Sequence, residues 1–198
     1  MKPIFLFFFL FVANQIFAQR FEGGIMAGAV ASQLDGDHRA GYHKLGFLAG
    51  GFVKTKLKPP FGMQMEIKFI QKGSKGKDTL FNTYSYYASR LNYIEIPILL
   101  SYTYKEKFAG YLGASAGYLI SAFEDKDSYG FEKAYPEFDK FEISGHAAIS
   151  YKLTEKLNVM FMFSYSAFGV RDAYPDYYQY IQRGQYNNVL SLSLYYQI

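Results

Sequence analysis

The side chains that could do chemistry in this chain are three histidines and a set of charged residues on alternating segments. His38 and His43 stand beside Asp35 and Asp37 in the stretch DGDHRAGYH, and His146 lies far away. A metal or catalytic site needs ligands that converge with a defined geometry, and spacing within one segment does not establish this. The sequence has no cysteine and no G-x-S-x-G, H-E-x-x-H or P-loop pattern. We therefore interpret DGDHRAGYH as a solvated loop and expect no enzyme activity, metal or cofactor.

A second group of titratable residues falls on the polar face of segments that alternate between apolar and polar residues. In FEISGHAAISYKL (141–153) every second residue is apolar or small, which places the two sets on opposite faces of a strand. The polar faces of three such segments carry Glu66, Lys68, Glu95, Glu142, His146 and Lys152. Charges enclosed together must be paired or hydrated, so these residues predict a polar network. A structural plug and a proton or ion path both fit this network, and we favour the plug.

The segments that position these residues are predicted strands, and alternation indicates eight of them. No segment after the N-terminus has eighteen consecutive apolar residues, which excludes a second transmembrane helix. The predicted strands are 21–32, 45–57, 61–72, 91–104, 108–123, 138–153, 157–167 and 187–198. Long and short connections alternate without a break, and the short ones are KPP, KEK and TEK. This pattern predicts an all-β, eight-stranded antiparallel up-and-down transmembrane β-barrel with short periplasmic turns and long external loops.

The N-terminal residues and the aromatic residues agree with an outer-membrane location. MKPIFLFFFLFVANQIFAQ has one lysine, an apolar run and a small residue at position 18. It predicts a cleaved signal peptide over residues 1–18, followed by a barrel domain over 19–198. Aromatic residues on the apolar faces gather near the strand ends, as in the girdles of such barrels. The expected periplasmic group is Tyr102, Tyr104, Tyr151 and Tyr196, and the expected outer group is Phe69, Phe141 and Tyr165.

Two of the long connections have compositions that suit contacts outside the cell. The last one carries Tyr174, Tyr177, Tyr178 and Tyr180. Exposed tyrosines combine an apolar ring with a hydroxyl and suit protein or glycan contacts, but the same residues could also cap the barrel mouth. The connection EDKDSYGFEKAYPEFD is acidic, yet it lacks the regular ligand spacing of a calcium loop. The net charge of +4 without a concentrated basic stretch makes nucleic acid an unexpected partner.

Several stretches resemble the PorT-like outer-membrane β-barrel proteins of Bacteroidetes-type bacteria. They are IFAQ, GIMAGAVAS, GYHKLGFLAGGFV, IKFIQKGSK, LNYIEIPILLSY, GYLGASAGYLIS and YKLTEKLNVMFMFSYS, and they span nearly the whole mature chain. The resemblance implies an outer-membrane β-barrel in a Gram-negative cell envelope. It implies little about activity, because most proteins of this kind have no assigned role. One branch is associated with secretion across the outer membrane, and the family supplies no catalytic residues that could be carried over.

Three hypotheses for function follow. The first is a non-enzymatic outer-membrane barrel that presents external loops, as an accessory of an envelope or secretion assembly, with membrane lipid and envelope proteins as partners. The alternative is a soluble, exported lipocalin-like barrel that binds an apolar small molecule, in which the apolar faces would point inward. A lipid-modifying enzyme that uses His38, His43 or His146 comes third.

Overall fold

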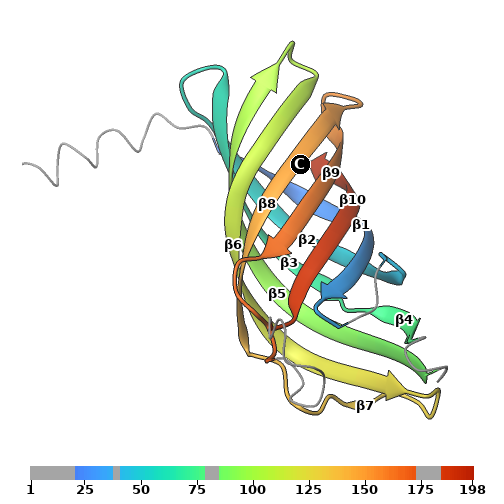
Figure 1. Cartoon of the computed structure of the whole chain (residues 1–198). Helices are drawn as coiled ribbons and strands as arrows, with labels where there is room; N and C mark the ends of the chain where they lie inside the picture. The colour runs from blue at the N-terminus through green and yellow to red at the C-terminus, as the bar shows by residue number, and fades with distance from the viewer. Residues whose placement is uncertain (1–20, 38–40, 79–84, 173–183) are drawn as a thin grey trace, which may run out of the picture.

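Eight long antiparallel strands form a closed barrel in the computed structural model, which describes residues 21–37, 41–78, 85–172 and 184–198. Closure comes from pairing of the first strand with the last and of β5 with β6 (Figure 1). The strands are β1 (Phe21–Asp35), β2 (Lys44–Lys56), β3 (Phe61–Lys72), β5 (Ser85–Tyr104), β6 (Phe108–Lys126), β8 (Phe141–Lys152), β9 (Leu157–Ser166) and β10 (Tyr186–Gln197). The predicted fold class is confirmed.

Three strands extend well past the ends that alternation predicts. β1 ends at Asp35 rather than at residue 32. β5 begins at Ser85 rather than at residue 91, and β6 ends at Lys126 rather than at residue 123. Two short strands, β4 (Lys75–Asp78) and β7 (Glu132–Lys133), pair with the extensions of β5 and β6 inside connections that the sequence indicates as loops. β4 and β7 are too short for an alternating pattern to be recognised in the sequence. Four strands thus continue beyond the barrel at the end opposite the short turns, at the lower end of Figure 1.

The barrel is apolar on the outside and polar on the inside. On β8, Phe141 and Ile149 are 76% and 67% exposed, whereas Glu142 and His146 are 4% and 5% exposed. The same alternation runs along β3, where Met65 and Ile67 are exposed. A water-soluble barrel would have the reverse arrangement, because exposed apolar surface of this extent is unfavourable in water. The soluble lipocalin-like alternative is therefore not favoured.

Two rows of outward side chains mark the limits of the membrane-facing band. The outer row runs in register across four strands, through Phe69, Ile94, Tyr118 and Phe141. The periplasmic row runs through Tyr104, Phe108 and Tyr151. Rings also touch within each group, as in the Tyr118–Phe141 pair at 5.3 Å and the Phe108–Tyr151 pair at 5.0 Å between centroids.

The two rows stand a constant distance apart along the strands. Ten residue steps separate Ile94 from Tyr104 on β5, Phe108 from Tyr118 on β6 and Phe141 from Tyr151 on β8. At 3.4 Å per residue and a strand tilt near 40°, this span covers about 26 Å along the barrel axis. That height matches the apolar band of outer-membrane barrels.

The connections differ at the two ends of the barrel as the sequence predicts. Residues 57–60, 105–107 and 153–156 form the short turns, which lie together at the upper end in Figure 1. Lys105 and Glu106 have φ angles of 49° and 57°, the left-handed conformation that the tightest hairpin turns require. No helix in the described part of the chain is long and apolar enough to cross a membrane. The predicted signal peptide, residues 1–18, lies outside the described residues.

Candidate functional site

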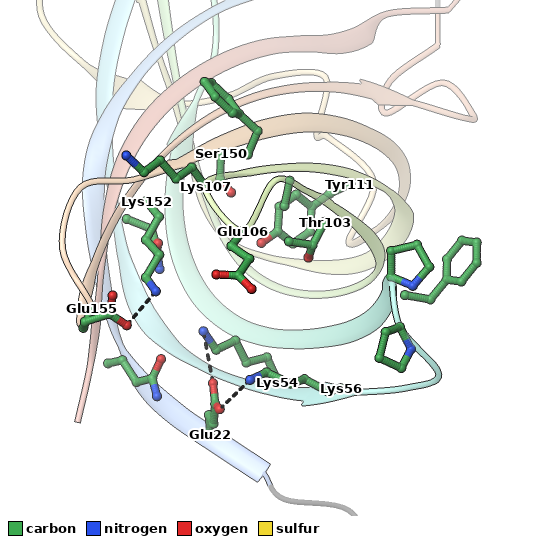
Figure 2. Close-up of a pocket in the computed structure, with 17 residues that line it drawn as sticks. Glu22, Lys54, Lys56, Thr103, Glu106, Lys107, Tyr111, Ser150, Lys152 and Glu155 are labelled. Carbon is green, nitrogen blue, oxygen red and sulfur yellow. Dashed lines mark hydrogen bonds and ion pairs between the residues drawn. The ribbon is translucent and has the colours of Figure 1, made fainter.

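The periplasmic mouth of the barrel opens into a charged vestibule of about 500 Å³ (Figure 2). Its walls pair most of their own charges: Lys54 Nζ lies 3.3 Å and Lys56 Nζ 3.7 Å from the carboxylate of Glu22. Lys152 lies here too, with its ammonium 2.6 Å from Glu155 Oε2. The vestibule is thus a rim of largely satisfied ion pairs.

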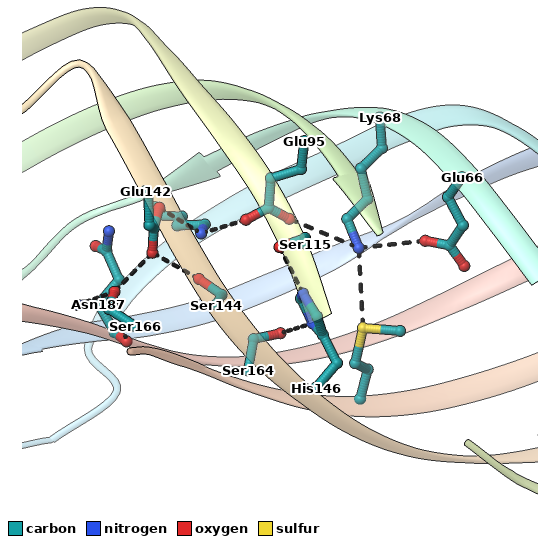
Figure 3. Close-up of polar contacts among 12 residues, drawn as sticks. Glu66, Lys68, Glu95, Ser115, Glu142, Ser144, His146, Ser164, Ser166 and Asn187 are labelled. Atoms are coloured by element: carbon teal, nitrogen blue, oxygen red, sulfur yellow. Dashed lines mark hydrogen bonds and ion pairs between the residues drawn. The ribbon is translucent and has the colours of Figure 1, made fainter. Parts of the chain in front are cut away.

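A continuous network of ion pairs fills the lumen deeper inside (Figure 3). Lys68 Nζ lies 3.3 Å from Glu66 Oε2 and 3.7 Å from Glu95 Oε2. The ammonium of Lys72 contacts Glu95 as well and lies 3.0 Å from Glu142 Oε2. All five side chains are buried, and the two lysines stand between three carboxylates. The alternating charges therefore link β3, β5 and β8 inside the lumen.

Side chains from β3 reach strands on the far side of the barrel. Lys68 Nζ lies 3.8 Å from Met162 Sδ on β9, which is four strands away around the wall in either direction. The Tyr195 hydroxyl on β10 donates to Glu66 Oε1 at 2.9 Å. An eight-stranded barrel is just wide enough for its own side chains to fill, and these contacts show that they meet across the interior.

Hydroxyl groups satisfy the remaining polar atoms of the network. Ser144 and Ser166 donate to Glu142 Oε1 at 2.9 Å and 2.6 Å. His146 lies between two serines, with Ser164 Oγ 2.8 Å from Nδ1 and Ser115 Oγ 2.7 Å from Nε2. This environment holds the imidazole ring by both nitrogens without any carboxylate contact.

Five of the six network residues named from the sequence lie together, and the sixth does not. Glu66, Lys68, Glu95, Glu142 and His146 line the middle of the lumen. Lys152 is six positions beyond His146 on β8, about 20 Å further along the strand toward the periplasmic end at the usual rise per residue. It binds Glu155 in the vestibule instead.

The sequence prediction does not include Lys72, the lysine at the centre of the network. Lys72 is fully buried and bridges Glu95 and Glu142. It shares a strand face with Glu66 and Lys68, because even-numbered residues of β3 point inward. Extending the alternation by two more steps, to the last residue of the predicted strand, would have found it.

Beyond the outer aromatic row, β4, β7 and the extended ends of β5 and β6 form a structure that we call the external ledge (residues 75–78, 85–93 and 119–140). Arg171, which follows β9, fastens the ledge to the barrel mouth by contacting the carboxylate of Glu124 and donating to the Tyr87 hydroxyl at 3.2 Å. Its guanidinium also lies 4.0 Å from the centroid of the Phe138 ring. These contacts tie three segments together outside the membrane-facing band.

The charge of Glu124 is set by two opposing effects. Burial alone would raise the pKa of this carboxyl, but the hydrogen bond from Tyr87 and the positive charge of Arg171 lower it below its ordinary value. Glu124 therefore remains a carboxylate at neutral pH, and a second ion pair links it to Lys126 at 3.4 Å. The base of the ledge is a buried, charged junction.

The connection that carries β7 exposes large aromatic side chains. Tyr129 is 89% and Tyr135 is 79% exposed, and the Phe131 ring lies 4.3 Å below the guanidinium of Arg90. The aromatic residues that the sequence indicates as external contacts lie outside the described residues: Tyr174, Tyr177, Tyr178 and Tyr180.

The histidines do not form a site with other ligands in the described part of the chain. No group of three or more His, Asp or Glu side chains there could hold a metal ion. His43 and His146 lie on different structures, the first external connection and the lumen of the barrel. His38 lies outside the described residues.

Comparisons with known proteins agree with this architecture. The family model described as outer membrane protein beta-barrel domain matches residues 15–172. Ail of Yersinia pestis, solved with the heparin analogue sucrose octasulfate, is 13% identical over 90% of this chain and 99% of its own, with a TM-score of 0.50. Neisserial surface protein A is 11% identical over 91% of this chain and 99% of its own, with a TM-score of 0.55.

At these identities the two solved structures show the fold alone, and no curated protein matched the chain. The family model covers most of the barrel, from residue 15 to residue 172. The outward apolar band, the polar lumen and the short turns at one end are the features of that class. The chain belongs to the outer membrane protein β-barrel domain family.

Proposed function

We propose that this protein is a non-enzymatic accessory of an envelope or secretion assembly and acts by presenting the external ledge to a protein partner. The observation that carries the proposal is the Arg171 junction, which fixes the ledge to the barrel and holds its exposed aromatic side chains outside the membrane. A rigid scaffold that positions loops is a common arrangement for recognition. The resemblance to PorT-like proteins, one branch of which is associated with secretion, supports the same role.

The partner surface has a definite chemistry. Tyr129 and Tyr135 supply exposed rings with hydroxyl groups, the residue type enriched at protein interfaces. In the same segment Lys133 pairs with Glu137, and the remaining acidic side chains give the segment a net negative charge. We infer that packing against the exposed rings stabilises the contact.

The interior network serves as a plug in this proposal. Its three carboxylates and two ammonium groups are paired across the lumen, and moving an ion past them would separate buried charges. In planar bilayers we expect the purified protein to give no steady conductance. Replacing both Lys68 and Glu95 with alanine should open a measurable one, whereas steady conductance of the unmodified protein would contradict the plug.

The position of the ledge can be tested by labelling, because the chain has no native cysteine. A Tyr135→Cys variant should react with a membrane-impermeant maleimide on intact cells. A Glu106→Cys variant, in the turn between β5 and β6, should react only after the outer membrane is permeabilised. The reverse labelling pattern would place the ledge in the periplasm and refute the proposal.

Partner binding can be tested by photo-crosslinking in the native host. A photoreactive residue in place of Tyr135 should give a protein adduct that disappears when Tyr129 is changed to serine. The same residue in place of Ile149 faces lipid and serves as the control. Protein adducts of equal yield at both positions would contradict recognition by the ledge. An adduct whose yield is unchanged by the Tyr129 substitution would contradict it as well.

Residues 1–18 are proposed to be a signal peptide that is removed on export. Mass spectrometry of the protein from outer membranes should then give an N-terminus at Gln19.

A further inference from the structure

On β3, β5 and β6 the outward side chains change from apolar to polar over two or three residues along each strand, whereas on β2 they remain apolar as far as Leu45. Above the row that contains Phe69, Ile94 and Tyr118, the next row in register contains Gln71, Asn92 and Ser121. These three side chains are hydrogen-bonded in sequence: Gln71 Nε2 donates to Asn92 Oδ1 at 3.1 Å, and Asn92 Nδ2 donates to Ser121 Oγ at 2.9 Å. A boundary of this kind on a lipid-facing surface corresponds to the level of the lipid head groups.

Three cationic side chains from different strands lie close together just beyond this boundary, on the side of the ledge. Arg90 is on the outer face of β5, two residues beyond Asn92, and Lys75 pairs with Ala88 on the same face. Lys44, at the start of β2, is buried and begins on the lumen-facing side of its strand, but its ammonium reaches the outward Gln71 Oε1 at 3.4 Å and donates to the carbonyl of Leu45. Arg90 and Lys75 lie close enough to Lys44 for their positive charges to act on it, and Lys44 is three residues further toward the ledge than Phe47.

The cluster has no acidic partner among the described residues, which distinguishes it from the other lysines on the long strands, although the turn lysines Lys58, Lys105 and Lys107 also have none there. No carboxylate among the described residues is within 4.0 Å of Lys44, Lys75 or Arg90, and the buried Nε of Arg90 has no hydrogen-bond partner there. By contrast, a carboxylate partner is present for Lys54, Lys68, Lys72, Lys126, Lys133 and Lys152.

Like charges held together at the edge of a low-dielectric layer repel one another. An anion bound among them would offset this unfavourable electrostatic free energy. Arginine and lysine are the residues that bind phosphate most strongly, arginine through its planar fork of donors. The location of the cluster favours a phosphate that belongs to a membrane lipid. Lys75 and Arg90 lie on the outer face of the wall at the level of the outer-leaflet head groups, next to apolar side chains against which acyl chains can pack. The ammonium of the buried Lys44 reaches the same region.

We propose that Lys44, Lys75 and Arg90 bind the phosphate group of an outer-leaflet lipid whose acyl chains lie along the Phe69–Ile94 part of the barrel wall. The Phe131 ring orients the Arg90 guanidinium from the side of the ledge. Bound lipid would then connect the ledge to the membrane surface, independently of whether the ledge also binds a protein.

The experiment is native mass spectrometry of the protein purified from outer membranes into detergent micelles and titrated with diphosphorylated lipid A. A Lys75→Gln/Arg90→Gln variant should bind this lipid about tenfold more weakly. The matched control removes two positive charges from the periplasmic turns, Lys58→Gln/Lys107→Gln, and should bind like the unmodified protein. A gel of unheated samples checks that each variant remains a folded barrel.

Two further arms identify the ligand. Dephosphorylated lipid A should bind the unmodified protein as weakly as the diphosphorylated lipid binds the double variant. Millimolar inorganic phosphate should leave lipid binding intact. Equal affinity for both lipids, equal losses in the two double variants, or full displacement by inorganic phosphate would each overturn a lipid phosphate site.

Discussion

Replacing Lys72 with methionine tests whether the lumen network stabilises the barrel. Lys72 has no exposed surface, and its ammonium lies between the carboxylates of Glu95 and Glu142. Methionine has a similar length and no charge, so the variant keeps most of the packing and leaves both carboxylates without this partner. Glu95 retains Lys68 at 3.7 Å, whereas Glu142 retains only the hydroxyls of Ser144 and Ser166.

Removing one partner of a buried ion pair costs about 3–5 kcal/mol, because the remaining charge is left uncompensated in a low-dielectric interior. We expect the free energy of unfolding to fall by that amount in Lys72→Met. Adding Glu142→Gln should recover a large part of the loss, because the amide can still accept hydrogen bonds from the two serines without carrying a charge. The difference between the double variant and the two single variants measures the coupling directly.

The assay is urea unfolding of the protein folded into phosphatidylcholine vesicles, with the folded fraction read from the mobility of unheated samples. Lys152→Met is the control, because its partner Glu155 is 91% exposed and the pair contributes little in high dielectric. If Lys72→Met and Lys152→Met unfold at the same urea concentration, the network does not stabilise the fold and the reasoning is refuted.

Two further predictions concern the ledge and the barrel wall. The pKa of Glu124 is lowered in the folded protein, so its carboxylate contributes stability above the ordinary pKa of about 4.3, and this stability is lost as the pH falls through the lower folded value. Amide exchange protection of the β6–β7 segment, corrected for intrinsic rates, should therefore drop below pH 4 or so in the unmodified protein. In Glu124→Gln it should already be low at pH 7 and change little on acidification, and a parallel fall in both proteins would contradict the assignment. On the wall, a Cβ on Gly113 would lie 2.0 Å from the carbonyl oxygen of Ile98, whereas a Cβ on Gly110 would meet nothing within 4 Å. Gly113→Ala should lower the free energy of unfolding by about 1–3 kcal/mol in the same urea assay, and Gly110→Ala should leave it unchanged; equal values would show that the wall relaxes at no cost.

The sequence by itself determined the barrel and the direction in which its faces point. Alternation is a local property of period two, so FEISGHAAISYKL could be divided into its two faces without knowing what either face touches. The order of long and short connections then identified an up-and-down barrel with its apolar face outward. The strand 61–72 has the same bounds in the structure as in the sequence prediction.

Only the tertiary structure decided which charges meet. Lys72 and Glu142 are 70 positions apart, and Arg171 and Glu124 are 47 apart. Whether such residues touch depends on the strand register and on the width of the closed barrel, and neither is encoded in local periodicity. The same register separates Lys152 from the network and gathers Lys44, Lys75 and Arg90 at the head-group level. Alternation thus specifies a face for each side chain, and closure of the barrel specifies its neighbours.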